Sequence, residues 1–374
     1  MTWALWLANA AASKTAREET MSHFAFSPMG LRARQRISGL ACAATLAALG
    51  ASAPARADER ALADFYSKNK ITIAVGFSPG GNYDLYARVI ARHMGRAIPG
   101  NPEFVVQNMP GAGSRVLANA LFGRGPFDGT MIGVPNQGIP TDQALGEQGV
   151  QFDAAKFYWI GSPNQEVNVA WTWTTSKVRS LDDARRIEGV MGSSGPGSPT
   201  YVYPRVMNML LGTKFKVVSG YPGSNELDHA IEKGEVDGRG AVSWAALKVT
   251  NDWVQQGKVN LLVQIGLKKA ADLPNLPLLH ELATKDEDRQ VLEFLSLAPA
   301  LGRPFFMPPR SPEDRVAAVR KAFDATMKDP AFLADAQRSR LDVSPLTWQE
   351  MEAIVAKTLN APKNVVERAR EAMK

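Results

Sequence analysis

The sequence is poor in the residues that carry redox and metal chemistry. Its 374 residues contain one cysteine, Cys42, which lies in the leader described below. Of the four histidines, the three that follow the leader are His93, His229 and His280, and each is isolated. His280-Glu281 lacks the second histidine of a zinc-binding helix. We therefore predict no disulfide, no thiol chemistry, no metal site and no cofactor in the mature chain.

The chain also lacks a dense basic region. Its formal net charge is +6, but residues 1–57 contribute six basic and two acidic residues. The remainder has 37 Lys and Arg against 35 Asp and Glu, with no clustered run. This balance disfavours nucleic acid as a partner. Hydrophobic content of 45% and the length of the chain fit a soluble protein with two domains.

Several motifs of enzymes are missing from the two glycine-rich loops, 76–81 and 192–200. Neither loop ends in the Gly-Lys-Ser/Thr of a Walker loop, and the first has the wrong glycine spacing for a dinucleotide site. The second loop, Gly192-Ser-Ser-Gly-Pro, lacks the last glycine of a hydrolase elbow. These absences favour a protein that is not an enzyme.

Residues 1–57 have the three parts of a secretory signal. A basic segment, 32–36, precedes an apolar segment, 37–53, and Ala55-Arg56-Ala57 is an A-x-A cleavage site, so we predict that the mature chain begins at Asp58 in the periplasm. Met29 is a natural start, and residues 1–28 are interpreted as an over-extended reading of the gene. A membrane anchor is the alternative, but the apolar segment is short and rich in alanine. Lipid attachment at Cys42 is disfavoured because the apolar segment continues beyond it.

The stretch from Ile71 to Met94 predicts a strand, a glycine turn and a helix. Apolar, mostly β-branched residues at 71–75 favour a buried strand, and Ser78-Pro-Gly-Gly81 ends it. Asp84 is a candidate N-cap for the helix that follows, and Arg88 is placed to pair with it. A glycine turn at a helix N-terminus presents backbone N–H groups and the positive end of the helix dipole, which together favour an anion.

Similar units follow, and they predict a parallel sheet covered by helices. Strands are expected at 103–107 and 130–134, so the segments 78–84, 108–114 and 135–137 should meet along one rim of the sheet. Further strands are expected at 157–163, 168–174, 189–191, 214–219, 236–242 and 259–265. The loop 192–200 joins one of them to a helix at 201–211, which repeats the first arrangement.

The C-terminal part is predicted to be helical. Ser311 is the expected N-cap of a helix that has Pro312 at its first position, and Thr347-Trp-Gln-Glu350 is a capping box. We expect this part to pack back onto the first domain.

Two glycine-serine loops, each opening a helix on its own α/β half, suggest a clamp for an anion. The hydroxyl groups of Ser78, Ser193, Ser194 and Ser198 add donors. The alternative is that each glycine loop only lets a strand turn into a helix.

Five segments in order along the chain resemble the Bug family, the TctC-type receptors of tripartite tricarboxylate transporters. These segments are FSPGGNYDLYAR at 77–88, NMPGAG at 108–113, DGT at 128–130, GSSGPGS at 192–198 and GEVD at 234–237. The resemblance implies an α/β type II periplasmic-binding-protein fold with a hinge crossed twice and a ligand cleft. Lobe I would comprise 58–166 and about 280–374, and lobe II about 167–279.

The resemblance also implies that the two loops hold a carboxylate. The expected ligand-binding residues are Phe77, Ser78, Gly80, Gly81, Asn82, Asp84, Asn136, Ser193, Ser194, Gly197, Ser198, Thr200 and Gly223. The sequence departs from the family pattern at three places: Tyr201 replaces a usual histidine, Pro222 a usual lysine and Ser78 a usual proline. The identity of the ligand therefore cannot be inferred from a relative.

We predict a monomeric, non-catalytic receptor that binds a small organic acid and delivers it to the membrane subunits of a transporter. An enzyme on the same scaffold and a protein that senses ligand for a membrane partner are the alternatives. Asp84 can cap a helix or contact the ligand, and the sequence leaves both roles open.

Overall fold

The computed structural model describes residues 53–194, 198–221, 224–249 and 252–373. The chain divides into two units, Met1–Arg56 and Ala57–Lys374. The sheets, the cavity and the polar clusters described below all lie in the second unit. Most of the predicted leader lies outside the described residues. In the part of the chain that the structure describes, no helix has the length and apolar character needed to cross a bilayer.

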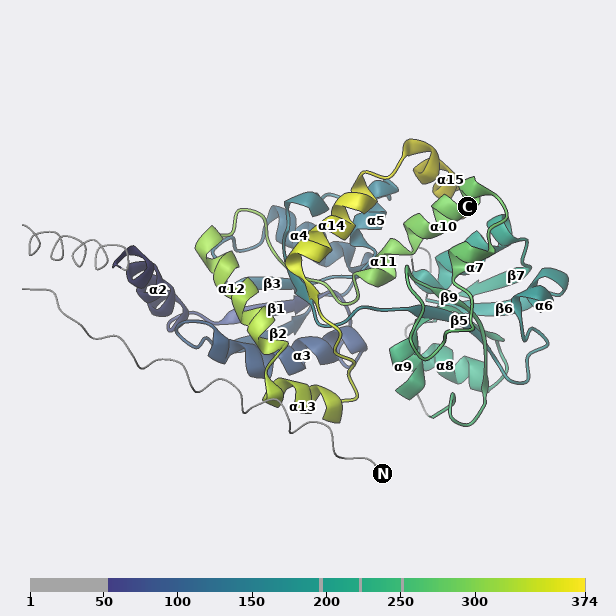
Figure 1. Cartoon of the computed structure of the whole chain (residues 1–374), viewed down its shortest axis with the longest axis horizontal. Coiled ribbons are helices and arrows are strands. Elements are labelled where there is room, and N and C mark those ends of the chain that lie inside the picture. Colours follow the sequence, from purple (N-terminus) through teal and green to yellow (C-terminus); the bar gives the residue numbers. More distant parts are fainter. Residues whose placement is uncertain (1–52, 195–197, 222–223, 250–251, 374) are drawn as a thin grey trace, which may run out of the picture. The chain divides into compact units, whose positions relative to one another are not determined.

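The first of two β-sheets has six strands in the order β11-β4-β10-β3-β1-β2 (Figure 1). Its strands are β1 (Ile71–Val75), β2 (Phe104–Asn108), β3 (Met131–Val134), β4 (Tyr158–Ser162), β10 (Phe305–Met307) and β11 (Leu346–Thr347). β1 pairs in parallel with both β2 and β3, and Val75 is in register with Asn108 and Val134. The carboxyl ends of these three strands therefore meet at one rim, as the sequence predicted.

Helices cover both faces of the first sheet, and the sheet and these helices together form the first lobe. They are α2 (Ala53–Tyr66), α3 (Asn82–Met94), α4 (Arg115–Gly123), α5 (Ile139–Ala144), α12 (Glu313–Thr326), α13 (Pro330–Arg338) and α14 (Trp348–Leu359). Alternation along β1 sends Ile71, Ile73 and Val75 into a core with α3, α12 and α13. Ala74 points to the opposite core, which contains residues of α4 and α14.

The second sheet has five strands in the order β7-β6-β8-β5-β9 and defines the second lobe. Its strands are β5 (Asn168–Trp173), β6 (Gly189–Ser193), β7 (Phe215–Ser219), β8 (Gly238–Ser243) and β9 (Val259–Ile265). Here β6 is parallel to β7 and β8, whereas β5 is antiparallel to β8 and β9. This sheet therefore repeats the parallel arrangement of the first lobe only around β6.

Two sets of helices cover the second sheet. They are α6 (Leu181–Arg186), α7 (Pro199–Leu211), α8 (Ser224–Glu232), α9 (Trp244–Val249), α10 (Asp286–Leu295), α11 (Leu297–Ala300) and α15 (Lys363–Met373). Residues of α7, α10 and α15 share one core, and residues of α8 and α9 share another. Short 3-10 turns complete the fold: η1 (Gly95–Ala97), η2 (Ala112–Ser114), η3 (Ala154–Lys156) and η4 (Leu279–Leu282).

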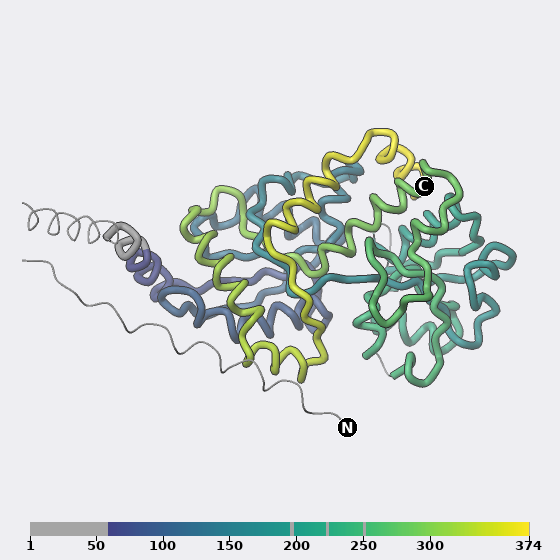
Figure 2. Tube along the Cα trace, viewed as in Figure 1, coloured from purple at the N-terminus to yellow at the C-terminus, as the bar shows by residue number. Residues whose placement is uncertain are grey.

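The chain passes between the sheets along two main crossings (Figure 2). It leaves the first sheet after β4, through residues 163–167, and returns before β10, through residues 301–304. A third connection follows α14, because α15 lies in the core of the second lobe. The C-terminal helical part therefore packs on both lobes and not on the first alone.

Helix starts show where local sequence signals were sufficient. Ser180 caps α6 and Thr347 forms the predicted capping box with Glu350. Two predicted caps are wrong. Gly81 is the N-cap of α3, which places Asp84 inside the first turn. Pro312 is the N-cap of α12, and the hydroxyl of Ser311 instead donates to the carbonyl of Pro308 at 2.8 Å.

Candidate ligand-binding site

The first glycine turn is held by a carboxylate from its own helix. Asp84 is 2% exposed. Its Oδ2 accepts the backbone N–H of Gly80 at 2.9 Å and Nε of Arg88 at 2.8 Å. Its Oδ1 accepts Nδ2 of Asn108, from the end of β2, at 2.9 Å. The predicted pair of Asp84 with Arg88 is thus confirmed, and one amide of the turn is already occupied.

Opposing effects act on the ionisation of Asp84. Burial by itself would raise the pKa of this carboxyl group, but the hydrogen bonds from Arg88, Gly80 and Asn108 outweigh burial and lower it. Asp84 is therefore an ionised, internally paired group that fixes the shape of the turn.

The loops after β1, β2 and β3 are tied to one another. The hydroxyl of Ser114 accepts the backbone N–H of Asn136 at 2.5 Å. A Cβ at Gly76 would lie 2.2 Å from Cβ of Ser114, so only glycine allows this close approach. The backbone N–H of Gln137 donates to the phenol of Tyr83 at 3.3 Å, which links the third loop to α3. The predicted rim is therefore one connected structure.

The second glycine loop places hydroxyl groups at the N-terminus of α7. Ser198 Oγ lies 2.8 Å from Thr200 Oγ1 and 3.3 Å from Ser193 Oγ. The backbone N–H of Ser194 donates to Thr200 Oγ1 at 3.3 Å. Ser198 is the N-cap position of α7 and Pro199 its first residue. These hydroxyls lie at the positive end of a helix, which suits an anionic group.

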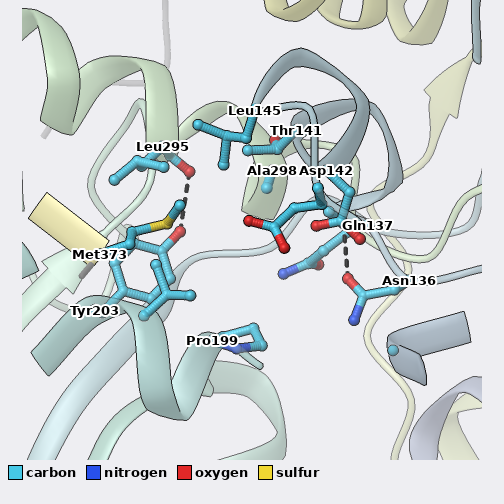
Figure 3. A pocket seen from close by; sticks show the side chains of 14 residues that line it. Asn136, Gln137, Thr141, Asp142, Leu145, Pro199, Tyr203, Leu295, Ala298 and Met373 are labelled. Atoms are coloured by element: carbon cyan, nitrogen blue, oxygen red, sulfur yellow. Dashed lines mark hydrogen bonds between the residues drawn. The ribbon is translucent and has the colours of Figure 1, made fainter. Parts of the chain in front are cut away.

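A cavity lies between the rim of the first lobe and the start of α7 (Figure 3). Fourteen residues line it: Gly113, Asn136, Gln137, Gly138, Thr141, Asp142, Leu145, Glu147, Pro199, Val202, Tyr203, Leu295, Ala298 and Met373. In Figure 3, Asn136, Gln137 and Asp142 lie on one side, across from Tyr203 and Met373. The cavity therefore has a wall from each lobe.

The wall from the first lobe carries negative charge. Asp142 and Glu147 both line the cavity, and Nη1 of Arg115 lies 3.8 Å and 3.5 Å from their carboxylate oxygens. Burial raises the pKa of Asp142 to about 7, with Arg115 opposing this effect and Glu147 adding to it. Asp142 is thus a carboxyl group that titrates near neutral pH.

A buried ion pair joins the two main crossings. Glu166 lies on the first and Arg303 on the second, and each side chain is 4% exposed. The guanidinium of Arg303 also lies over the rings of Tyr83 and Tyr86, at 5.3 and 4.8 Å from their centroids. The crossings also touch closely at Gly302, where a Cβ would lie 1.8 Å from the carbonyl oxygen of Asn164.

Gln137 connects this ion pair to the cavity. With its amide nitrogen facing the acceptors, Gln137 donates to Oε2 of Glu166 at 3.2 Å and to the carbonyl of Gly302 at 2.9 Å. The side chain is 5% exposed and lines the cavity. One residue therefore contacts both the cavity and the segments that link the lobes.

The structure brings some predicted residues together and leaves others apart. Asn136 lines the cavity. Ser193, Ser194, Ser198 and Thr200 cluster with one another at the start of α7, next to the lining residue Pro199, but are not themselves among the lining residues. The described lining of this cavity does not include the expected residues of the first turn: Phe77, Ser78, Gly80, Gly81, Asn82 and Asp84. Gly197 and Gly223 lie outside the described residues.

Several lining residues were not predicted from the sequence. Asp142 and Thr141 lie in α5, Tyr203 in α7 and Met373 in the last helix. The first two follow the Asn136 loop closely and could have been found by extending that motif. Tyr203 and Met373 carry no local signal, because only packing of α7 and α15 brings them to the cavity. Among the described residues, no group of three His, Cys, Asp or Glu side chains is arranged to hold a metal ion.

Solved structures define the class of fold. A protein of R. palustris with adipate aligns with a TM-score of 0.61 and 20% identity, over 80% of this chain and 97% of that chain. MatC from Rhodopseudomonas palustris with bound malate aligns with a TM-score of 0.59 and 19% identity, over 82% and 99% of the two chains. The chain thus has the two-lobe α/β fold of periplasmic solute-binding proteins, which confirms the predicted fold class.

The sequence comparisons show which family the chain is similar to. Residues 185–370 match the family model described as the tripartite tricarboxylate transporter family receptor, TctC. A protein of Cupriavidus necator described as "UPF0065 protein in gbd 5'region" is 24% identical over 351 residues, which cover 90% of this chain and 98% of that protein. These matches confirm the predicted resemblance to the TctC-type, or Bug, receptors.

Proposed function

We propose that the protein is a periplasmic receptor that captures a small organic acid between its lobes and presents it to the membrane subunits of a tripartite transporter. The observation that carries this proposal is the cavity lined by both lobes, where the rim of three parallel strands faces the N-terminus of α7. Ligands of open α/β sheets bind at this kind of rim. The family match and the adipate and malate named for two structural neighbours support a carboxylate ligand.

The ligand carboxylate is proposed to lie between the two glycine loops. Ser78, Gly81 and Asn82 approach it from the first loop, and Ser193, Ser194, Ser198 and Thr200 from the second. The N–H of Gly80 is engaged by Asp84, so we assign Asp84 a positioning role rather than a direct contact. We further propose that the receptor is a monomer and that it releases its ligand unchanged.

A thermal-shift screen of mono-, di- and tricarboxylates tests the binding function. A ligand that binds only the folded state raises the melting temperature by mass action, and the shift grows with ligand concentration. We expect at least one organic acid to give such a shift. Recovery of the acid unchanged after incubation would separate a receptor from an enzyme. A panel of acids that leaves the melting temperature constant would refute the proposal.

A matched pair of glycine variants tests the location. A Cβ at Gly81 would meet only the carbonyl of Ser78, at 3.9 Å, and one at Gly123 would meet nothing within 4 Å. Neither glycine has a positive φ. Gly81→Val adds bulk at the proposed carboxylate site and should weaken binding about tenfold or more. Gly123→Ala should leave affinity unchanged, and equal affinities in both variants would place the ligand elsewhere.

A further inference from the structure

The cavity between the lobes has two chemically different walls. Asn136, Gln137, Thr141, Asp142 and Glu147 come from the first lobe and are polar. The opposite side is mostly apolar and comes from α7, the α10–α11 segment and the end of α15: Pro199, Val202, Tyr203, Leu295, Ala298 and Met373. The hydroxyl of Tyr203 is already bonded to the carbonyl of Leu295 at 2.9 Å, so its ring is what faces the cavity. Such a cavity fits a ligand segment with an apolar side and a polar end.

The charge of the described lining is of one sign. Asp142 and Glu147 are the only charged side chains among the described lining residues, which include no Lys, Arg or His. Arg115 lies behind them, and its distances of 3.8 and 3.5 Å exceed the usual length of a charge-assisted hydrogen bond. One loosely placed cation therefore serves two carboxylates. A second carboxylate from a ligand would be repelled in this partly desolvated place.

We propose that this cavity receives the protonated amine of a ligand that carries a carboxylate at its other end, with an apolar chain between them. This inference rests on the proposed function, because the glycine loops are taken to hold the carboxylate. An ammonium group has three donors and no acceptor, so it can bond to both acidic side chains at once. The absence of a three-ligand metal group among the described residues favours an organic cation over a metal ion.

The geometry also indicates the shape of the ligand. The hydroxyl cluster of Ser193, Ser198 and Thr200 adjoins Pro199, which is itself a lining residue. A chain that starts at these hydroxyls therefore passes along the apolar wall before it reaches Asp142 and Glu147. An ω-amino acid with several methylene groups has this order of groups, whereas a dicarboxylate of the same length places a negative charge against the acidic wall.

The test compares ligands of equal length at pH 8, where Asp142 is ionised. Titration calorimetry is run with 6-aminohexanoate, hexanedioate and hexanoate, and with 4-aminobutanoate and butanedioate. We expect the amino acid of at least one pair to bind about tenfold tighter than its dicarboxylate. The combined change Asp142→Asn and Glu147→Gln should abolish this preference and favour the dicarboxylate. Glu188→Gln, which removes an exposed carboxylate in the second lobe, is the matched control.

The outcomes separate the two proposals. If dicarboxylates bind well, amino acids bind poorly and the double variant changes neither, the inference on the amine is overturned and the proposed function stands. If no acid of either kind binds to the wild-type protein, the proposed function fails and this inference fails with it. A preference for the amino acid that survives the double variant would place the amine outside this cavity.

Discussion

The two glycine loops look alike in sequence but differ in how their polar groups are used. In the first, 76–84, the buried carboxylate of Asp84 accepts the N–H of Gly80 and the loop is closed on itself. In the second, 192–200, the hydroxyls of Ser198 and Thr200 lie 2.8 Å apart in a cluster at the start of a helix. The first loop is thus pre-organised by an internal anion, whereas the second can exchange weak hydroxyl contacts for a ligand.

A glycine turn at a helix N-terminus is therefore not always available to bind an anion from solution. A neighbouring carboxylate can satisfy its amides permanently, and the turn then serves to fix the rim. Substitutions in the two loops and in the cavity should separate these roles.

The largest effect is expected at the buried ion pair that joins the two main crossings. Arg303→Ala leaves Glu166 buried without its partner, and breaking a buried pair of this kind costs about 3–5 kcal/mol of unfolding free energy. Urea unfolding followed by circular dichroism measures it. The exposed pair Lys70–Glu103, each 63% exposed, is the control, and Lys70→Ala should change stability by less than about 1 kcal/mol. Similar losses in both variants would contradict a structural role for the buried pair.

The second effect concerns the carboxylate that closes the first loop. Asp84→Ala removes the carboxylate that accepts hydrogen bonds from the N–H of Gly80 and from the side chains of Arg88 and Asn108, at a cost of about 2–3 kcal/mol. Because the folded-state pKa of Asp84 lies below its unfolded value, its stabilisation is present above the unfolded pKa and is lost as pH falls through the folded pKa. The wild-type and Asp84→Ala proteins should therefore converge in stability on acidification. A gap that stays constant down to low pH would argue against Asp84 as the internal anion.

The third effect concerns Asp142 in the cavity between the lobes, whose contribution to stability has the opposite dependence on pH. The folded-state pKa of Asp142 is raised to about 7, so the folded protein holds this proton more tightly than the unfolded chain. Stability is therefore greatest below the unfolded pKa and falls as pH rises through 7. Asp142→Asn should remove this loss and be more stable than wild type at pH 8 by roughly 2 kcal/mol. Thermal unfolding at pH 5 and pH 8 measures the difference, and an equal change at both values would contradict it.

The smallest effect on stability is expected at the second loop. Ser198→Ala removes a hydroxyl from a cluster rather than a charge, and it should change unfolding free energy by about 0.5 kcal/mol or less. Affinity for an organic acid should fall about fivefold, because the variant loses the free energy of about one hydrogen bond to the ligand. Calorimetric titration measures the affinity and thermal unfolding measures the stability of the same sample. Ser67→Ala, at an exposed position just after α2, is the control. A large loss of stability with unchanged affinity would assign the second loop a structural role instead.

Local signals in the sequence were sufficient for most of the fold. β1 and β9 were predicted with their observed ends, because runs of β-branched and apolar residues are bounded by turn residues. The N-caps Ser180 and Thr347, whose side chains accept a backbone N–H, were also predicted from the sequence. Asp84 was misplaced because a carboxylate near a helix start suits both an N-cap and the first turn. Only the backbone angles at Gly81 separate the two positions.

The site was less predictable than the fold. Asn136 was named because it follows a strand that ends at the predicted rim, and the serines of 193–198 were named because they lie in the second glycine loop. The acidic wall was not foreseen, since Asp142 and Glu147 become part of one cavity only through the position of α5. Met373 reaches the same cavity from the end of the chain, and its place depends on the packing of α15 against α7 and α10.

By itself, the sequence determined the order of strands and helices, the two glycine loops and the rim at which three parallel strands end. These features follow from periodicity and turn chemistry, which act over a few residues. Which polar groups bond to one another depends on the tertiary structure. Asp84 closes the first loop, Gln137 joins the cavity to the Glu166–Arg303 pair, and the acidic and apolar walls face one another. Gln137, Glu166 and Arg303 are far apart in sequence, as are the two walls of the cavity, so their distances depend on the packing of whole helices against two sheets.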